Sequence, residues 1–101
     1  MADIIFTPVT TEAALGVNTG AASNVGTSEF VRLHNSADAN TEHLVTLEES
    51  TAAGGTDIGT FTLGGTESVI IRKAPTDQLF ASDAAVLACG VRVVSKGGLV
   101  G

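Results

Sequence analysis

Apolar and polar residues alternate along most of this chain, and the alternation is clearest over residues 57–73. Two alternating runs flank the pair Gly64 and Gly65, and glycines supply the positive φ that a tight turn needs. The pattern predicts a β-hairpin with one apolar face. Because an isolated hairpin is marginal in water, other strands must cover that face. The side chains expected on it are Phe61, Leu63, Val69 and Ile71.

A second region of alternation, in the first half of the chain, predicts two more strands. In residues 29–35, Val31 and Leu33 occupy every second position, which places them on one buried face. A cluster of Asn, Asp and Ser at residues 35–40 predicts a turn. Residues 43–48 then predict a third strand, antiparallel to the strand before the turn.

The last third of the chain predicts a short helical turn followed by a long strand. Thr76 or Asp77 is a suitable N-cap for one helical turn through Phe80. Residues 84–95 alternate again, and Gly90 is a candidate bulge. The buried face should carry Leu87, Cys89, Val91 and Val93, and the opposite face Ala88, Gly90 and Arg92.

The beginning of the chain has a different composition. Residues 4–6 are apolar and precede Pro8, which restricts them to an edge strand or an arm. Residues 9–27 offer few side chains to bury, so we expect an irregular segment that gains order from another chain, a floppy surface loop being the alternative. The expected divisions are an N-terminal arm or irregular segment (1–27), a β-sandwich domain (28–96) and a C-terminal tail (97–101).

These elements predict an all-β fold, a small antiparallel β-sandwich or barrel of about five to seven strands with an extended N-terminal arm. At 101 residues and 10.1 kDa the chain forms one domain. Its net charge of −6 repels phosphate, so we expect no nucleic acid and no membrane as a partner. The longest apolar stretch, residues 84–91, is too short to cross a bilayer. The single cysteine, Cys89, excludes an internal disulfide and fits synthesis in a reducing cytosol.

Side chains that carry chemistry are few. His34 and His43, with Asp38 and Glu42 between them, are conceivable metal ligands, but half-exposed histidines and ordinary turn chemistry explain them better. Cys89 lies among alternating apolar residues, where a cysteine is a small core side chain rather than a nucleophile. The sequence contains neither a phosphate-binding glycine pattern nor a nucleophile elbow. We therefore expect no catalytic residue, no metal site, no cofactor and no enzymatic activity.

Contact with another protein is the interpretation that remains. An apolar segment at a sheet edge can add a strand to a neighbouring sheet, although ordinary fraying of the terminus is the alternative. The residues predicted to bind a partner are Ile4, Ile5, Phe6, Pro8 and Val9.

Several motifs together resemble a known group of proteins. They are VRLHN at 31–35, LVTL at 44–47, GTFTLGGTESV at 59–69 and RKAPTD at 72–77. In this order they resemble small virion structural proteins of tailed bacteriophages, and are most similar to capsid decoration (cement) proteins of marine and cyanobacterial phages. The resemblance covers roughly residues 28–96.

The resemblance implies a β-sandwich or barrel that binds the outside of the major capsid protein lattice and stabilises the head, often as a trimer or other homo-oligomer. It implies a location on the capsid surface of the virion after synthesis in the host cytoplasm. Two alternatives within the particle are a tail, head–tail adaptor or fibre component, and a carbohydrate-binding adhesion module with exposed Phe30 and Phe80 beside a loop carboxylate. A hydrolase that uses Cys89 with His34 or His43 is the enzymatic alternative.

Overall fold

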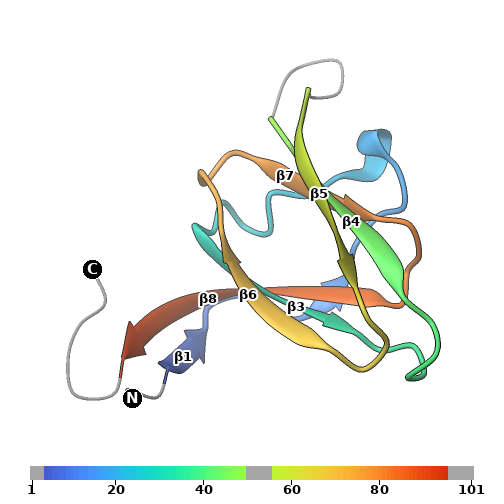
Figure 1. Ribbon diagram of the computed structural model, residues 1–101. Helices are drawn as coiled ribbons and strands as arrows, with labels where there is room; N and C mark the ends of the chain where they lie inside the picture. The colour runs from blue at the N-terminus through green and yellow to red at the C-terminus, as the bar shows by residue number, and fades with distance from the viewer. Residues whose placement is uncertain (1–3, 50–55, 96–101) are drawn as a thin grey trace.

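The structure, a computed structural model, describes residues 4–49 and 56–95. Within these ranges eight strands form two antiparallel sheets, which face each other as the two layers of a sandwich (Figure 1). The predicted all-β sandwich is therefore confirmed. The described part of the chain has one helix, a three-residue 3₁₀ turn, which is far too short to cross a membrane.

The first layer is a five-stranded sheet whose strands come from both ends of the chain. Its order is β1-β8-β3-β6, and the short β2 pairs with β8 beside β1. The last strand in sequence thus lies in the interior of the sheet (Figure 1). The bounds are β1 Ile4–Pro8, β2 Ala13–Ala14, β3 Phe30–Asn35, β6 Ser68–Arg72 and β8 Val86–Ser95.

The second layer is a three-stranded sheet of order β5-β4-β7. Its outer edge at β7 is covered by the segment that contains the 3₁₀ turn η1. The bounds are β4 His43–Glu48, β5 Asp57–Leu63, β7 Gln78–Ala81 and η1 Thr19–Ala21.

The predicted hairpin over residues 57–73 is wrong, because β5 pairs with β4 while β6 pairs with β3 in the other sheet. The turn between them is a corner that carries the chain from one layer to the other. Asn35 at the end of β3 holds this corner, since its carbonyl accepts from Thr66 N at 2.9 Å and its N–H donates to the Glu67 carbonyl at 3.0 Å. Gly65 is required there because a Cβ would collide with the Asp38 carbonyl.

The predicted pairing of residues 43–48 with residues 29–35 is wrong for the same reason, because β3 and β4 lie in different sheets. Alternation specifies the two faces of a strand but not its neighbour.

Side chains from both sheets meet in one core. Val31 and Leu33 are 0% exposed, as predicted, and Leu63 is 4% exposed. Phe61 and Ile71 pack partly against the core, whereas Val69 is 36% exposed, so its predicted burial is wrong. The core consists of Leu15, Val25, Val31, Leu33, Val45, Leu63, Leu79, Ala81, Val86 and Ala88.

The predicted faces of β8 are inverted. Val31 lies opposite Gly90 and Leu33 opposite Ala88, and directly opposed residues share a face of the sheet. The small residues therefore face the core, where a Cβ on Gly90 would collide with the Ser28 hydroxyl. The face predicted to be buried in the core, with Cys89 among its residues, is the outer face.

The helical turn predicted from Thr76 or Asp77 to Phe80 is also wrong. The chain makes a turn in which Asp77 N donates to the Ala74 carbonyl at 3.0 Å, and β7 follows directly. Pairing with β4 on one side and with Ser23 on the other outweighs the capping signal.

The segment predicted as an arm, residues 1–27, contributes β1, β2 and η1 from residue 4 onward. Leu15 is 4% and Val25 8% exposed, and both belong to the core. Part of the order of this segment therefore comes from its own chain. The tail at 97–101 lies outside the described residues.

Candidate interaction surface

β1 places the predicted partner-binding residues on two different faces. Phe6 lies opposite Val93 and Pro8 opposite Val91, so both share the outer face of the five-stranded sheet. Ile5, one residue along, points to the other side. The side chains of Ile5, Phe6 and Val9 are 51%, 38% and 51% exposed. Ile4 begins the strand opposite Ser95.

We call the side of the five-stranded sheet that faces away from the core the outer face. Its members follow from the strand registers, because opposed residues point the same way. They are Phe6 and Pro8 of β1, Leu87, Cys89, Val91 and Val93 of β8, Phe30, Arg32 and His34 of β3, and Ser68, Ile70 and Arg72 of β6.

Arg32 connects three parts of the outer face. Its guanidinium lies 5.9 Å from the centre of the Phe6 ring and makes an ion pair with Glu12 at 3.2 Å. It also donates to Ser68 Oγ at 3.1 Å, and that oxygen lies 2.7 Å from His34 Nδ1. A cation over an aromatic ring is attracted to it by about 0.5–1 kcal/mol at an exposed site. Arg32 therefore links β3 to β1 across the intervening strand β8.

Arg72 repeats the arrangement at the other side of the outer face. It lies 6.0 Å from the centre of the Phe30 ring and pairs with Glu29 at 2.9 Å. Both arginines are thus neutralised by a carboxylate from a neighbouring loop, so the outer face presents aromatic rings between ion pairs rather than a region of excess charge.

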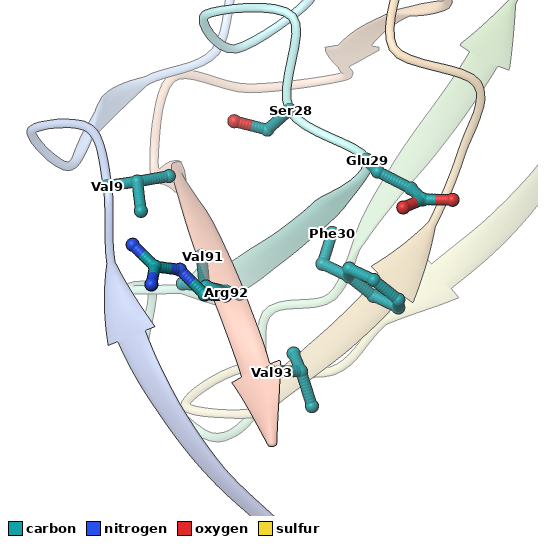
Figure 2. A pocket seen from close by; sticks show the side chains of 7 residues that line it. All are labelled: Val9, Ser28, Glu29, Phe30, Val91, Arg92 and Val93. Carbon is teal, nitrogen blue, oxygen red and sulfur yellow. The ribbon is translucent and has the colours of Figure 1, made fainter. Parts of the chain in front are cut away.

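A groove opens at the first residue of β3, where β8 continues past it. β3 pairs with β8 as far as Val91, whereas β1 accompanies β8 to Ser95. Beyond Val91, β8 therefore has a strand on one side only. A volume of about 410 Å³ lies there, and Figure 2 shows Phe30 and Val93 on one side of β8 with Arg92 on the other. Its lining residues are Val9, Ser28, Glu29, Phe30, Val91, Arg92 and Val93.

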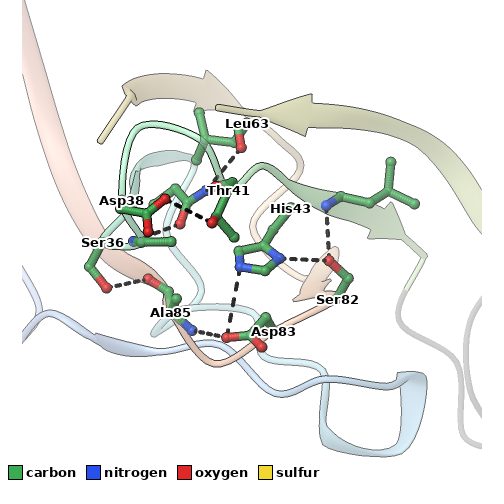
Figure 3. A network of polar contacts seen from close by, with 11 residues as sticks. Ser36, Asp38, Thr41, His43, Leu63, Ser82, Asp83 and Ala85 are labelled. Carbon is green, nitrogen blue, oxygen red and sulfur yellow. Dashed lines mark hydrogen bonds and ion pairs between the residues drawn. The ribbon is translucent and has the colours of Figure 1, made fainter. Parts of the chain in front are cut away.

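The two histidines are in different sheets, His34 in β3 and His43 in β4. His43 lies 3.9 Å from the Asp83 carboxylate and 3.5 Å from Ser82 Oγ (Figure 3). Ser82 Oγ also accepts from Leu44 N at 3.0 Å, so this cluster ties the turn after β7 to the start of β4. Among the described residues, no three His, Cys, Asp or Glu side chains are grouped so that they could hold a metal.

Asp38, the carboxylate between the histidines in sequence, serves its own turn. Its Oδ1 accepts from Asn40 N at 3.0 Å and from Thr41 Oγ1 at 2.8 Å. This is the turn chemistry that the sequence favours for the segment. Glu42 is exposed at the end of the same turn.

Cys89 is 7% exposed on the outer face beneath the loop that follows β1. Its Sγ lies 3.1 Å from the Thr10 carbonyl and 3.4 Å from the Gly90 carbonyl, and neither bond involves a histidine. A buried thiol without a base beside it is a structural side chain.

Lys73 is the buried cation of the described chain, at 5% exposure. Its Nζ donates to the Pro75 carbonyl at 3.0 Å. Burial lowers the pKa of Lys73 below the ordinary value of 10.5, and the nearby Asp77 carboxylate opposes this shift. The residue thus lies in the turn between β6 and β7, where the burial of its charge costs stability.

Sequence reasoning missed Arg32 and Glu12 as parts of the surface, and it named Phe30 only for the carbohydrate-binding alternative. Phe30 and Arg32 alternate on the polar side of a predicted strand, which is the signal that places both on one face. Glu12 gives no such signal, because its contact with Arg32 spans 20 residues. The expected pair Phe30 and Phe80 does not form, since Phe80 belongs to β7 in the other sheet.

Comparisons with known proteins do not assign this chain to a family. No protein-family model matches the chain, and a search of the curated proteins finds no match. Among solved structures the chain is similar to one described as "Bacillus endospore appendages form a novel family of disulfide-linked pili", with 15% sequence identity and a TM-score of 0.46. The match covers 90% of this chain and 84% of the other. A likeness this distant carries no conclusion about partners or activity.

Proposed function

We propose that this protein is a structural component of a tailed-phage particle and binds the outside of the major capsid protein lattice through its outer face. Two observations support the proposal. Residues 28–96 resemble decoration proteins, and β1 adds exposed apolar side chains to one rigid sheet. The proposed contact depends on Phe6. This residue is 38% exposed, and the Arg32 guanidinium lies over its ring.

A contact surface made of strands has a physical advantage. The backbone of β1 is already ordered by pairing with β8, so binding does not have to fix a flexible arm. Covering an exposed phenylalanine contributes about 1.5–3 kcal/mol at most, or roughly one to two powers of ten in affinity. A protein that binds as an oligomer engages several lattice sites at once, which multiplies a modest affinity of this size.

A matched pair of truncations on β1 tests the proposal. Phe6→Ala removes a ring from the outer face, and Ile5→Ala removes an exposed side chain from the opposite side of the same strand. Purified proteins are incubated with undecorated phage heads and the bound fraction is measured after sedimentation. We expect wild type and Ile5→Ala to bind equally and Phe6→Ala to bind at least about tenfold more weakly.

Circular dichroism and thermal unfolding of both variants show whether the sheet survives. Absence of wild-type binding at micromolar concentration, or equal binding by a folded Phe6→Ala protein, contradicts the proposal. Loss of binding in both variants places the contact on the strand as a whole and contradicts the assignment to the outer face. A tail, adaptor or fibre position is distinguished by imaging the particle, because a decoration protein covers the head lattice.

A further inference from the structure

The chain covers the two edges of the three-stranded sheet unequally. At β7, Ala81 N donates to the Gly16 carbonyl at 3.0 Å, and Ser23 and Leu79 exchange two backbone hydrogen bonds of 3.0 and 2.8 Å. β5, at the other edge, pairs only with β4 among the described strands. Natural edge strands are usually protected by charge, proline or a covering segment. Asp57 is the one charged residue of β5, and beyond the bulge at that end residues 59–63 form a regular, open edge.

The peptide groups of Thr60 point toward this open edge. Peptide groups alternate between the two neighbours of a strand, and Leu44 of β4 directs its carbonyl toward Ser82 on the β7 side at 2.9 Å. Val45 therefore bonds toward β5, where it is paired with Phe61. One residue before Phe61, the N–H and C=O of Thr60 face outward, ready to pair with another strand.

Nothing in the described part of the chain explains why residue 59 is a glycine. Its φ is not in the left-handed region, and no atom of the described residues lies within 4 Å of a Cβ built there. A glycine inside a strand costs about 0.5–1 kcal/mol relative to alanine. Such a glycine often marks the close approach of another chain.

We propose that the β5 edge pairs with the β5 edge of a second copy, antiparallel about a two-fold axis at Thr60. Each Thr60 then opposes its counterpart in a hydrogen-bonded pair, and cross-strand threonine pairs are favourable. Each Gly59 lies opposite the second copy's Phe61, whose ring covers the position where Gly59 has no side chain. Aromatic cover of this kind compensates for glycine in sheets.

Charge complementarity favours a second copy of this chain as the partner of the β5 edge. Two shallow grooves flank the edge and share Phe61, one of about 280 Å³ with Arg72 at its wall and one of about 230 Å³ with Glu67 at its wall. An antiparallel two-fold arrangement brings the Glu67 groove of each copy against the Arg72 groove of the other. The Arg72 side chain is 74% exposed, so it is free to meet a second carboxylate besides Glu29. The same arrangement covers Ile58, which is 52% exposed.

This pairing does not rest on the proposed capsid contact. Its strand pairing uses β5 of the three-stranded sheet, whereas the proposed capsid contact depends on Phe6 of the five-stranded sheet, and Arg72 is the outer-face residue on which the pairing draws. It also concerns the protein alone, so its test requires no phage heads and fails or succeeds separately.

The two-fold register predicts that two variants of Thr60 associate poorly when each is alone but well when they are mixed. Thr60→Lys places two ammonium groups opposite each other, and Thr60→Glu places two carboxylates opposite each other, which is destabilising in both cases. In a mixture of the two variants, lysine faces glutamate. We expect a wild-type dimer in sedimentation equilibrium, at least about tenfold weaker association of each variant alone, and an equimolar mixture that recovers association to within about threefold of wild type.

Leu44→Lys is the control, because Leu44 is 44% exposed in the same sheet but on β4, away from the edge. This variant should associate like wild type. A wild-type protein that remains monomeric up to about 0.5 mM overturns the proposal. Wild-type-like dimers of either Thr60 variant, a folded but monomeric Leu44→Lys protein, or a mixture that does not recover association also overturn it.

Discussion

Replacing Asn35 by alanine tests whether one buried amide joins the two layers. Asn35 is 0% exposed at the end of β3. Its Nδ2 donates to the carbonyls of Thr41 and Leu63, each at 3.0 Å, and its Oδ1 accepts from Ala37 N at 3.0 Å. Two of these partners, Ala37 and Thr41, lie in the turn after β3, and the third, Leu63, ends β5 in the other sheet. The alanine variant leaves all three without that partner.

The expected cost follows from the number of bonds. A typical hydrogen bond contributes about 0.5–1.5 kcal/mol net, and a buried group left unsatisfied costs about 1–3 kcal/mol. Three bonds, one of them fully buried, give a loss of about 3 kcal/mol in the free energy of unfolding. A domain of this size has roughly 5–15 kcal/mol in total. The corresponding fall in Tm is about 12–24 °C, at about 4–8 °C per kcal/mol.

Urea denaturation followed by circular dichroism measures the loss. Asn35→Asp keeps the side-chain volume and the acceptor Oδ1, but it replaces the Nδ2 donor with a carboxylate oxygen that faces two carbonyl oxygens. At neutral pH this variant should therefore lose at least as much stability as the alanine variant. Asn40→Ala, at an exposed position in the adjacent turn, should stay within about 0.5 kcal/mol of wild type. A loss below about 1 kcal/mol for Asn35→Ala, or a tolerated Asn35→Asp, would refute the reasoning.

Two further changes should stabilise the protein. Thr66 has a φ of 66° at the corner between the sheets. Asparagine tolerates this conformation and keeps the backbone N–H, so Thr66→Asn should raise the free energy of unfolding by about 1 kcal/mol, measured by urea denaturation. An unchanged or lower stability would show that the corner is not strained. Lys73→Met removes a buried cation and should raise stability at neutral pH. At pH values between the lowered pKa of Lys73 and 10.5, the unfolded chain binds more protons than the folded one. The stability of the wild type should therefore rise with pH relative to that of the variant. A constant difference between the two proteins would contradict a lowered pKa for Lys73.

The faces of strands could be predicted where large apolar side chains mark them. Val31 and Leu33 have the charged Arg32 between them and His34 after them, so their burial follows from alternation. In β8 both faces carry small or apolar residues, and side-chain size favours the wrong face as the core. The space beneath β8 is instead filled from Ser28 and the opposite sheet, so Gly90 and Ala88 face inward. Alternation cannot choose between two apolar faces.

Strand partners could not be predicted, because they depend on contacts distant in sequence. The glycines at the end of β5 suit a hairpin turn as well as a corner between layers. What favours the corner is Asn35, which lies about thirty residues earlier and bonds to both sides of it. The candidate surface shows the same limit. The sequence predicts Phe6 as a contact residue, but the Arg32 guanidinium over its ring comes from a strand that is separated from β1 by β8.

The interior position of β8 has a consequence for how the molecule is made. On a ribosome, β1, β2 and β3 all emerge before the strand that joins them, so the larger sheet cannot assemble while β8 is still being synthesised. Until then, among the described strands, β1 and β2 have no partner strand and β3 has only β6, so these strands are open to wrong partners. Pairings between distant segments are slow to form, with times of milliseconds to seconds in comparable β-proteins. Newly made chains therefore pass through an interval after translation in which these unpaired strands can associate with other chains.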